Sequence, residues 1–422
     1  MSRHRFEAYL DKVFDFSCQV AALPEGRLYP RHQWKKVFEA LFLGAACQFP
    51  NVHRIEMECR EGVLSQRIGP LSEDTIGYAL ERQAPGPLFD LGCELARQLK
   101  RNGVLHSAWA RGRVVVAPDG IEICSSFVRC CDACLERRVE HKVGEELRTD
   151  VQYYHRLSAV VVVSGAFPIP LGIRFQKKGE TEVACSLALL RDLREQLGAR
   201  FFDLLVADAL YLQTPFVEEI ERLGYDWVIN LKENQPELLT EAQQATAGAP
   251  QYQEADEKHE LHLWHAPEVF WPVAHRSIRI VKTLRTLHKK RAPLRAADTA
   301  KKKNSKESFD EEGLNFYATN VELGSVPPRF IHQLGRSRWT IDAEAFQTIT
   351  TDSHLKQPSV HRGRGQAIVV LTMIRILAYT LSLVLYYRQV RSHSRSAAIG
   401  FCDMARKLGY AFLLLSRSHD SS

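Results

Sequence analysis

The run Phe202-Asp-Leu-Leu-Val-Ala-Asp208-Ala-Leu-Tyr211 decides the fold of this chain. Four aliphatic residues followed at once by an acid are typical of a buried strand that ends at Asp208. The run Arg113-Val-Val-Val-Ala-Pro-Asp119-Gly120 repeats this pattern, with Asp119 at the predicted strand end. A carboxylate beside the core is unfavourable unless something pairs with it, and a divalent cation is a common partner. The two runs therefore predict neighbouring central strands whose terminal acids share a metal ion.

A third acidic segment reads Arg338-Trp-Thr-Ile-Asp342-Ala-Glu344-Ala-Phe346. It contains no Gly or Pro, so it is compatible with a helix. Ile341 is expected to point into the core, which turns Asp342 toward the two strand acids. Glu344 lies about 200° further round an α-helix and is the substitute for the third acid. Two strand acids and one helix acid together favour a metal-clamping site.

The segments around these acids predict an α/β fold with a mixed sheet flanked by helices. The chain before residue 108 reads as helical, and Ser72 is a good N-cap for one of its helices. The expected order after it is strand, hairpin, helix, strand, helix, strand. The ranges are a strand at 113–119, a hairpin of 157–165 and 170–176, a helix at 182–197, a strand at 203–208, a helix at 215–223 and a strand at 226–231.

At these residues the chain resembles the DDE transposases of bacterial insertion sequences, which carry an RNase H-like catalytic core. Asp208-Ala-Leu-Tyr211 and the run from Gly224 to Pro236 match the second-acid strand and the strand after it. Tyr317-Ala-Thr-Asn320 and Arg338-Trp-Thr-Ile-Asp342 match the approach to the third acid. Tyr153-Tyr-His155-Arg, after a cysteine cluster, fits one branch of these enzymes.

The resemblance implies a domain organisation. Residues 1–108 would form a helical domain for DNA binding or assembly. Residues 109–234 and 314–390 would form the two parts of the RNase H-like core, the second part carrying the third acid. Residues 235–313 would be a β-rich insertion with a basic loop, and 391–422 a helical tail. An insertion at this place explains why the second and third acids are further apart than the first two.

The resemblance also implies a site and a reaction. Asp119, Asp208 and Asp342, with Glu344 as the substitute, would bind two Mg²⁺ or Mn²⁺ ions. Such a pair activates a water, and later a free 3′-hydroxyl, for attack on a phosphodiester. The chain departs from the family at two places: the third acid is Asp342 where the family has Glu, and Thr348, Ile349, Thr350 and Thr351 stand where the family often has Lys.

Basic residues flank the third acid in the sequence and indicate a polyanion partner. Ten Lys or Arg lie between Lys282 and Lys306 against one acid, and seven lie between Ser353 and Cys402 against none. A solvated loop or face is the alternative for an isolated charge run, but two such stretches favour phosphate contacts. The expected partner is double-stranded DNA, bound by a homodimer. The predicted DNA-binding residues are Lys232, Arg338, Trp339, Lys289, Lys290, Arg291, Lys301, Lys302, Lys303, Arg362 and Arg364. For Trp339, packing is the favoured role and stacking on a base is the alternative.

A cysteine cluster, Cys130-Cys131-Asp-Ala-Cys134, raises the question of zinc. A Cys-x₂-Cys pair supplies two of the four ligands that a tetrahedral site needs. The others would have to be Cys124 and a histidine, either His141 or His155. Because only one such pair exists, a loop with reduced thiols is favoured, and zinc at Cys131 and Cys134 is the alternative.

Composition fits a globular intracellular protein. The chain has 422 residues, 45% hydrophobic residues and a formal net charge of +6, enough apolar mass for two or three domains. The first residues lack the apolar core of a signal peptide, so a reduced bacterial cytoplasm, near the nucleoid, is expected. The run from Ala367 to Tyr387 is apolar but is interrupted by Arg375. A charge at mid-bilayer is expensive, so a buried core helix and no membrane contact are predicted.

Two functions remain open on the sequence. The first is a DNA transposase that binds the terminal repeats of its own element, cuts with divalent metal and transfers the 3′-hydroxyl ends. The second is a DNA-binding protein on the same scaffold that has lost catalysis. The short Asp342 and the absent Lys keep the second open.

Overall fold

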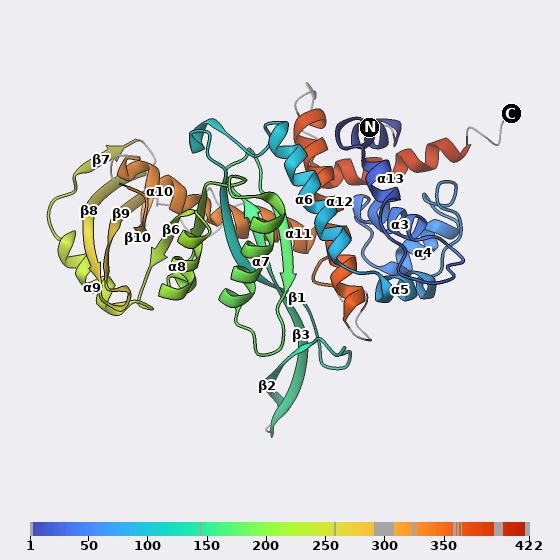
Figure 1. Cartoon of the computed structure of the whole chain (residues 1–422), viewed down its shortest axis with the longest axis horizontal. Helices are drawn as coiled ribbons and strands as arrows, with labels where there is room; N and C mark the ends of the chain where they lie inside the picture. The colour runs from blue at the N-terminus through green and yellow to red at the C-terminus, as the bar shows by residue number, and fades with distance from the viewer. Residues whose placement is uncertain are drawn as a thin grey trace, which may run out of the picture. The chain divides into compact units, whose positions relative to one another are not determined.

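The structure is a computed structural model that describes residues 3–143, 146–256, 259–290, 308–322, 326–357, 360, 363, 365–391 and 400–417. The chain divides into two compact units. Unit 1 is Met1–Phe201 with Thr340–Ser422, and unit 2 is Phe202–Trp339. Both combine helices with strands (Figure 1), which confirms the predicted mixed α/β fold with its N-terminal helices and its sheet flanked by helices.

Unit 1 begins with the predicted helices. These are α1 (Arg3–Phe14), α2 (Phe16–Ala21), α3 (Trp34–Ala46), α4 (Val52–Arg60), α5 (Glu73–Arg82) and α6 (Gly86–Arg101). Ser72 caps α5 as expected, because its side chain accepts a hydrogen bond of 3.3 Å from the backbone N–H of Thr75. Phe42 packs on Phe16 and Phe38, with ring centroids 4.7 and 5.9 Å away. This aromatic cluster joins α2 to α3.

The strands of unit 1 are built around one long strand. They are β1 (Val115–Ser126), β2 (Leu135–Val143), β3 (Glu146–Val162) and β4 (Ile169–Phe175). β3 pairs antiparallel with β1 along one side, and with β2 and then β4 along the other. The β3–β4 pairing confirms the predicted hairpin. β2 and the first half of β3 form a second hairpin that the sequence analysis did not predict.

Helix α7 (Glu182–Leu197) has the predicted bounds. Thr181 caps it, since its hydroxyl accepts a hydrogen bond of 3.2 Å from the backbone N–H of Ala184. The helix packs against β3 and β4. Gly172 of β4 makes this packing close, because a side chain there would lie 3.2 Å from Leu193 and 3.1 Å from Phe89 of α6.

The C-terminal part of unit 1 is helical. It consists of the π-helical segment η5 (Ile341–Phe346), α11 (Gln347–Thr351), α12 (Gln366–Leu385), the π-helical segment η6 (Tyr386–Val390) and α13 (Phe401–Arg417). Helix α12 packs against α3, α5, α6 and β4. It is apolar on all sides, as expected for a helix surrounded by protein.

Helix α12 is buried inside unit 1, as predicted for a core helix. By length and composition the segment Gln366–Val390 is apolar enough to cross a bilayer, but 83% of its most apolar window is buried inside the protein. Arg375, the interrupting charge, is buried and donates hydrogen bonds of 3.0 and 2.9 Å to the carbonyl oxygens of His354 and Pro50. Burial lowers the pKa of Arg375 to about 10, and the two carbonyls replace its water.

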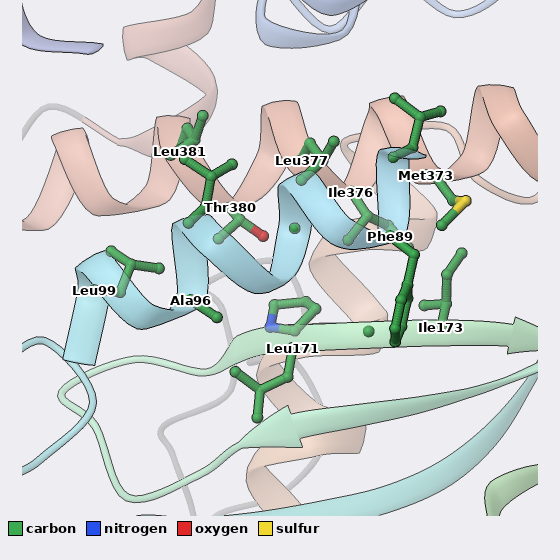
Figure 2. A pocket seen from close by; sticks show the side chains of 15 residues that line it. Phe89, Ala96, Leu99, Leu171, Ile173, Met373, Ile376, Leu377, Thr380 and Leu381 are labelled. Carbon is green, nitrogen blue, oxygen red and sulfur yellow. The ribbon is translucent and has the colours of Figure 1, made fainter. Parts of the chain in front are cut away.

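Figure 2 shows the interface of α6, α12 and β4 in unit 1. Phe89, Ile173 and Leu377 point into the space between these elements, and the lining is almost wholly apolar. The cavity left there is only about 40 Å³. An apolar gap of that size is a packing imperfection, not a ligand site.

Unit 2 is a sheet of strands in the order β5-β6-β10-β9-β8-β7. The strands are β5 (Leu204–Ala207), β6 (Asp226–Leu231), β7 (Tyr252–Ala255), β8 (His259–Trp271), β9 (Arg276–Lys290) and β10 (Ser308–Thr319). β5 and β6 are parallel, and the other neighbours are antiparallel. The long β8 and β9 confirm that the segment before the third acid is rich in strands, whereas β10 extends past residue 313, the predicted end of the insertion, whose bounds stay a prediction.

Helices and short turns complete unit 2. They are η2 (Ala209–Tyr211), α8 (Thr214–Arg222), α9 (Pro236–Ala245), η3 (Pro272–Ala274) and α10 (Pro328–Ser337). Helix α8 is the crossover between the parallel strands β5 and β6 and packs on β6. Helix α10 lies across the sheet and contacts β5, β6, β8, β9 and β10.

Candidate functional site

In unit 2, Asp208 stands where the sequence predicts it, directly after the buried strand β5. Its side chain is half-buried, and one carboxylate oxygen accepts a hydrogen bond of 2.9 Å from the backbone N–H of Leu210. This bond starts the turn η2 and fixes the rotamer of the acid. Asp208 is therefore an oriented carboxylate at the carboxyl end of a parallel strand pair, where α/β proteins place ligands.

Lys232 lies at the same end of that pair. It follows β6, which runs parallel to β5, and it is exposed. Two side chains in the turn that contains Lys232 connect this turn to the turn after Asp208. Asn234 donates a hydrogen bond of 2.6 Å to the carbonyl of Ala209, and Gln235 donates one of 2.9 Å to that of Leu212. Unit 2 thus presents an acid and a cation on two connected turns.

The run Tyr317-Ala-Thr-Asn320 has a structural role in unit 2. Thr319 donates a hydrogen bond of 2.6 Å to the carbonyl of Trp227, and the Asn320 side chain accepts one of 2.8 Å from the Trp227 backbone N–H. These bonds lock β10 to β6. Tyr317 packs flat against Gly335 of α10, where a side chain would clash with its ring at 2.1 Å. The run therefore positions the helix that leads to Arg338.

Arg338 and Trp339 end unit 2. Trp339 is 61% exposed, so the favoured role in core packing is wrong. The Arg338 guanidinium lies 5.9 Å from the centre of the Trp339 ring. The sequence favours packing because Trp is usually buried. Nothing in the local pattern shows that α10 ends before Trp339 and leaves its ring outside the core.

The structure corrects the position of Asp119 in unit 1. The residue lies within β1, opposite Ala159 of β3, and not at the end of a strand. It is half-buried, and its carboxylate accepts a hydrogen bond of 2.7 Å from the N–H of Gly120. The pair Asp119-Gly120 suggests a turn. The chain does not turn there, because β1 stays paired with the antiparallel strand β3 on both sides of these residues.

Glu182 is an acid near Asp119 that the sequence analysis missed. It is the first residue of α7, and it forms an ion pair with Arg156 of β3. A side chain at Gly120 would lie 2.5 Å from the Glu182 carboxylate, so this carboxylate lies directly against the glycine. Because strand residues alternate between faces, Glu182 approaches the face of β1 opposite to that of Asp119. The Thr181 cap followed by Glu182 was the available signal for this acid at a helix start.

Both candidates for the third acid lie on η5, which packs against β1 within unit 1. Ile341 is fully buried, as predicted, and Asp342 and Glu344 are exposed. The segment is a π-helix and not the expected α-helix, a form that is frequent at functional sites.

Glu344 has identified neighbours on the C-terminal helices. The pKa of Tyr379 and that of Tyr387 are raised mainly by burial, and the charge of Glu344 raises both further. Glu344 therefore lies close to α12 and η6. Asp342 stays the predicted third acid.

A basic cluster surrounds His332 in unit 2. Burial lowers the pKa of His332 to about 4, and Arg336, Arg285 and Arg329 add to this effect. Arg329 is partly neutralised by Glu254 at 2.8 Å. Lys282, at the start of the basic stretch, is held 4.4 Å above the Trp264 ring and donates to the carbonyl of Thr246. Lys282 therefore has a structural role.

Of the remaining predicted DNA-binding residues, two lie at the end of a strand and six lie outside the described residues. Lys289 and Lys290 end β9. The others lie outside the described residues, so their roles stay predictions: Arg291, Lys301, Lys302, Lys303, Arg362 and Arg364.

Comparisons with known proteins show the family of the chain. Residues 125–381 match the family described as the transposase DDE domain. A solved structure, the cryo-EM structure of a piggyBac transposase synaptic complex with hairpin DNA, shares 9% identity at a TM-score of 0.44 over 98% of this chain and 79% of that one. A search of curated proteins finds no match. Since the family match covers more than half of the chain, this protein belongs to the DDE-domain transposases.

Proposed function

We propose that this protein is the DNA transposase of a bacterial insertion sequence. It binds the terminal repeats of its element, cleaves phosphodiester bonds with divalent metal and transfers the 3′-hydroxyl ends to target DNA. One observation supports this most strongly. Within the segment that matches the transposase family, Asp208 ends a parallel strand on a turn that is hydrogen-bonded to the turn of Lys232.

The proposed metal ligands are Asp119, Asp208 and Asp342, which would hold two Mg²⁺ or Mn²⁺ ions. The donor chemistry of Asp208 fits, because one carboxylate oxygen bonds to the N–H of Leu210 and no described residue pairs with the other. Carboxylate oxygens are the ligands that such hard cations prefer. When bound, the ions activate the attacking oxygen and stabilise the leaving one.

The other residues bind and orient DNA in this proposal. Lys232 contacts a phosphate next to Asp208, because it is exposed and its turn is held in place by Asn234. The planar guanidinium of Arg338 binds a phosphate through two hydrogen bonds. The exposed ring of Trp339 stacks on a base. The protein acts as a homodimer on DNA in the bacterial cytoplasm.

A cleavage assay with the natural DNA ends tests the proposal. The substrate is a labelled duplex that carries the inverted repeats flanking the gene, incubated with the full-length protein and Mg²⁺. Wild type should nick at the repeat boundary and leave a 3′-hydroxyl, and EDTA should abolish the nick. Asp208→Asn should lose cleavage by more than about 100-fold and keep its DNA affinity, because a metal ligand serves the chemistry.

A matched control comes from the same unit. Glu237 is an exposed acid at the start of α9, and Glu237→Gln should cut like wild type. Cleavage by Asp208→Asn at the wild-type rate would refute the assignment of the site. Sequence-specific binding by a wild type that never cuts would favour the inactive DNA-binding protein instead.

A further inference from the structure

A buried group of metal-ligand atoms lies in unit 1, apart from the acids discussed above. Cys131, Cys134 and His155 are all buried, and their ligand atoms lie within 4.8 Å of one another. The two sulfurs are 3.5 Å apart, and Nε2 of His155 lies 3.2 Å from Cys131 Sγ and 3.5 Å from Cys134 Sγ. Two sulfur atoms and one imidazole nitrogen thus lie close together inside the core.

The local backbone presents these atoms together. Cys131 and Cys134 form a tight turn between β1 and β2, in which the N–H of Cys134 donates to the carbonyl of Cys131 at 3.1 Å. The N–H of Cys131 donates back to Cys134 Sγ at 3.2 Å. Such a donor favours the negatively charged form of the sulfur. His155 comes from the middle of β3, so strand pairing fixes it independently of the turn.

Cys124 is the natural fourth ligand. It lies on β1 directly opposite His155 of β3. Residues paired across two strands point to the same face of the sheet, and Cys124 is only 3% exposed. Cys124 is therefore a buried thiol on the same sheet face as His155, just outside the 4.8 Å group of Cys131, Cys134 and His155.

We propose that Cys124, Cys131, Cys134 and His155 bind one structural zinc ion. Zinc takes four sulfur and nitrogen ligands in a tetrahedron and is held by Cys₃His sets of this kind. With Zn–S near 2.3 Å and Zn–N near 2.1 Å, a tetrahedron places two sulfurs about 3.8 Å apart and sulfur and nitrogen about 3.6 Å apart. The observed separations among Cys131, Cys134 and His155 are within about 0.4 Å of these values, so small side-chain shifts suffice for these three, whereas the Cys124 sulfur, outside the 4.8 Å group, has to turn toward them.

A disulfide fits the cluster less well. It would join Cys131 and Cys134 at about 2.05 Å, and it gives His155 no reason to face both sulfurs. His141, the other histidine near the cluster in sequence, instead lies 3.5 Å from Asp150 in an exposed ion pair. The structure thus selects His155 as the nitrogen ligand.

The zinc turn would also hold the start of α12. The N–H of Asp132 donates a hydrogen bond of 3.0 Å to the carbonyl of Gly363. Gly365 has a left-handed backbone, with φ at 82°, and a side chain there would lie 2.6 Å from Ala133 Cβ and 3.2 Å from Cys131 Sγ. The ion would thus tie β1 and β3 to the chain entering the core helix, a closed and non-catalytic role that is separate from Mg²⁺ at the carboxylates.

The metal content of the purified full-length protein tests the site without any DNA. Protein made in zinc-supplemented medium and purified without chelators should contain one zinc per chain by elemental mass spectrometry. X-ray absorption at the zinc edge should show three sulfurs and one nitrogen. Cys131→Ser should lower the zinc content at least about fivefold, whereas Cys93→Ser, at a buried cysteine on α6, should keep it.

Further measurements cover the fourth ligand and the risk of misfolding. Cys124→Ser should reduce the sulfur count from three to two, and a count that stays at three would remove Cys124 from the site. Wild type stripped of metal should take up one Co²⁺ and show thiolate-to-cobalt absorption, a readout that needs no variant to fold. Wild type without bound zinc and without Co²⁺ uptake, or an intact Cys131–Cys134 disulfide by mass spectrometry, would overturn the proposal.

Discussion

Asp342 and Glu344 are two residues apart but have different surroundings. Burial raises the pKa of the buried Tyr379 and of the half-buried Tyr387, and the charge of Glu344 raises both further, so this exposed acid lies close to the C-terminal helices. We therefore expect Asp342→Ala to abolish DNA cleavage while DNA binding stays within about twofold, because a metal ligand acts on the chemistry. Glu344→Ala should cut within about threefold of wild type in the same assay.

The reverse result has a definite meaning. If Glu344→Ala is inactive and Asp342→Ala still cuts, then the third acid is Glu344 and the assignment by position after Arg338 and Trp339 is wrong.

His332 gives unit 2 a pH-dependent stability. Burial, with help from Arg336 and Arg285, lowers its pKa from 6.5 to about 4 in the folded protein. Between these values the unfolded chain binds a proton that the folded chain does not bind. Stability is therefore fully present above pH 6.5 and falls as the pH drops toward 4, by about 3 kcal/mol in all.

Urea titrations over this pH range measure the effect. His332→Gln should flatten the pH dependence whatever its effect on stability at neutral pH. The control is His53→Gln, because the His53 side chain is 69% exposed, and it should keep the wild-type slope. An unchanged slope in His332→Gln would show that another group controls it.

The position of a single residue is predicted correctly where it depends on the neighbouring residues in the sequence. The predicted position of Asp208 at the end of a strand is confirmed, because a short apolar run followed by an acid is compatible with few structures other than a buried strand. Asp119 is misplaced because the antiparallel partner β3, which is distant in sequence, extends β1 past the apparent turn. The approach of His155 to Cys131 depends on the same pairing, and spacing alone does not distinguish His155 from His141.

Among the elements, α12 offers the clearest test of how much a buried polar side chain contributes to the free energy of unfolding. Arg375 is the donor for two main-chain carbonyls, those of Pro50 and His354. Arg375→Leu keeps the apolar bulk of the side chain but leaves the Pro50 carbonyl without its donor, while the His354 carbonyl keeps only the N–H of Gln357 at 3.1 Å. We expect the free energy of unfolding to fall by about 2 to 4 kcal/mol, measured by urea denaturation.

An exposed arginine provides the control for this change. Arg406 of α13 pairs with Asp403 at 3.3 Å, and its side chain is 72% exposed. Arg406→Leu should change stability by less than about 0.5 kcal/mol. A similar loss in both variants would mean that Arg375 contributes nothing specific to the core.

The elements with strong local signals are those that the sequence predicts best. Helix α7 and strand β6 have the predicted bounds, since caps and apolar runs define both ends. The β2–β3 hairpin was missed because its strands are mostly charged and exposed, so no apolar alternation marks them. The π-helical form of η5 was missed because no sequence period separates it from an α-helix.

For the whole molecule, the charge distribution predicts how DNA binding responds to salt. The net charge is only +6, but ten basic residues lie between Lys282 and Lys306. Replacing Lys301, Lys302 and Lys303 by Gln should weaken binding to all sequences alike. Fewer counterions are then released, so the slope of log K against log salt should become shallower by about 2 to 3.

Three exposed lysines elsewhere are the matched control. Lys12, Lys35 and Lys178 are exposed on unit 1, and their replacement by Gln removes the same charge. Equal effects of the two triple variants in fluorescence-anisotropy titrations would assign the basic stretch a general electrostatic role and no direct phosphate contact.

The claim that Asp119, Asp208 and Asp342 share a metal site is tested most directly by a crystal structure of the protein with Mn²⁺. Anomalous scattering locates each ion without reference to the protein chain. We predict Mn²⁺ within about 2.3 Å of carboxylate oxygens of both Asp119 and Asp208, with Asp342 as a further ligand. Carboxylate oxygens of Asp119 and Asp208 more than about 8 Å apart, with no ion between them, would contradict the account, because even paired ions lie only about 4 Å from each other.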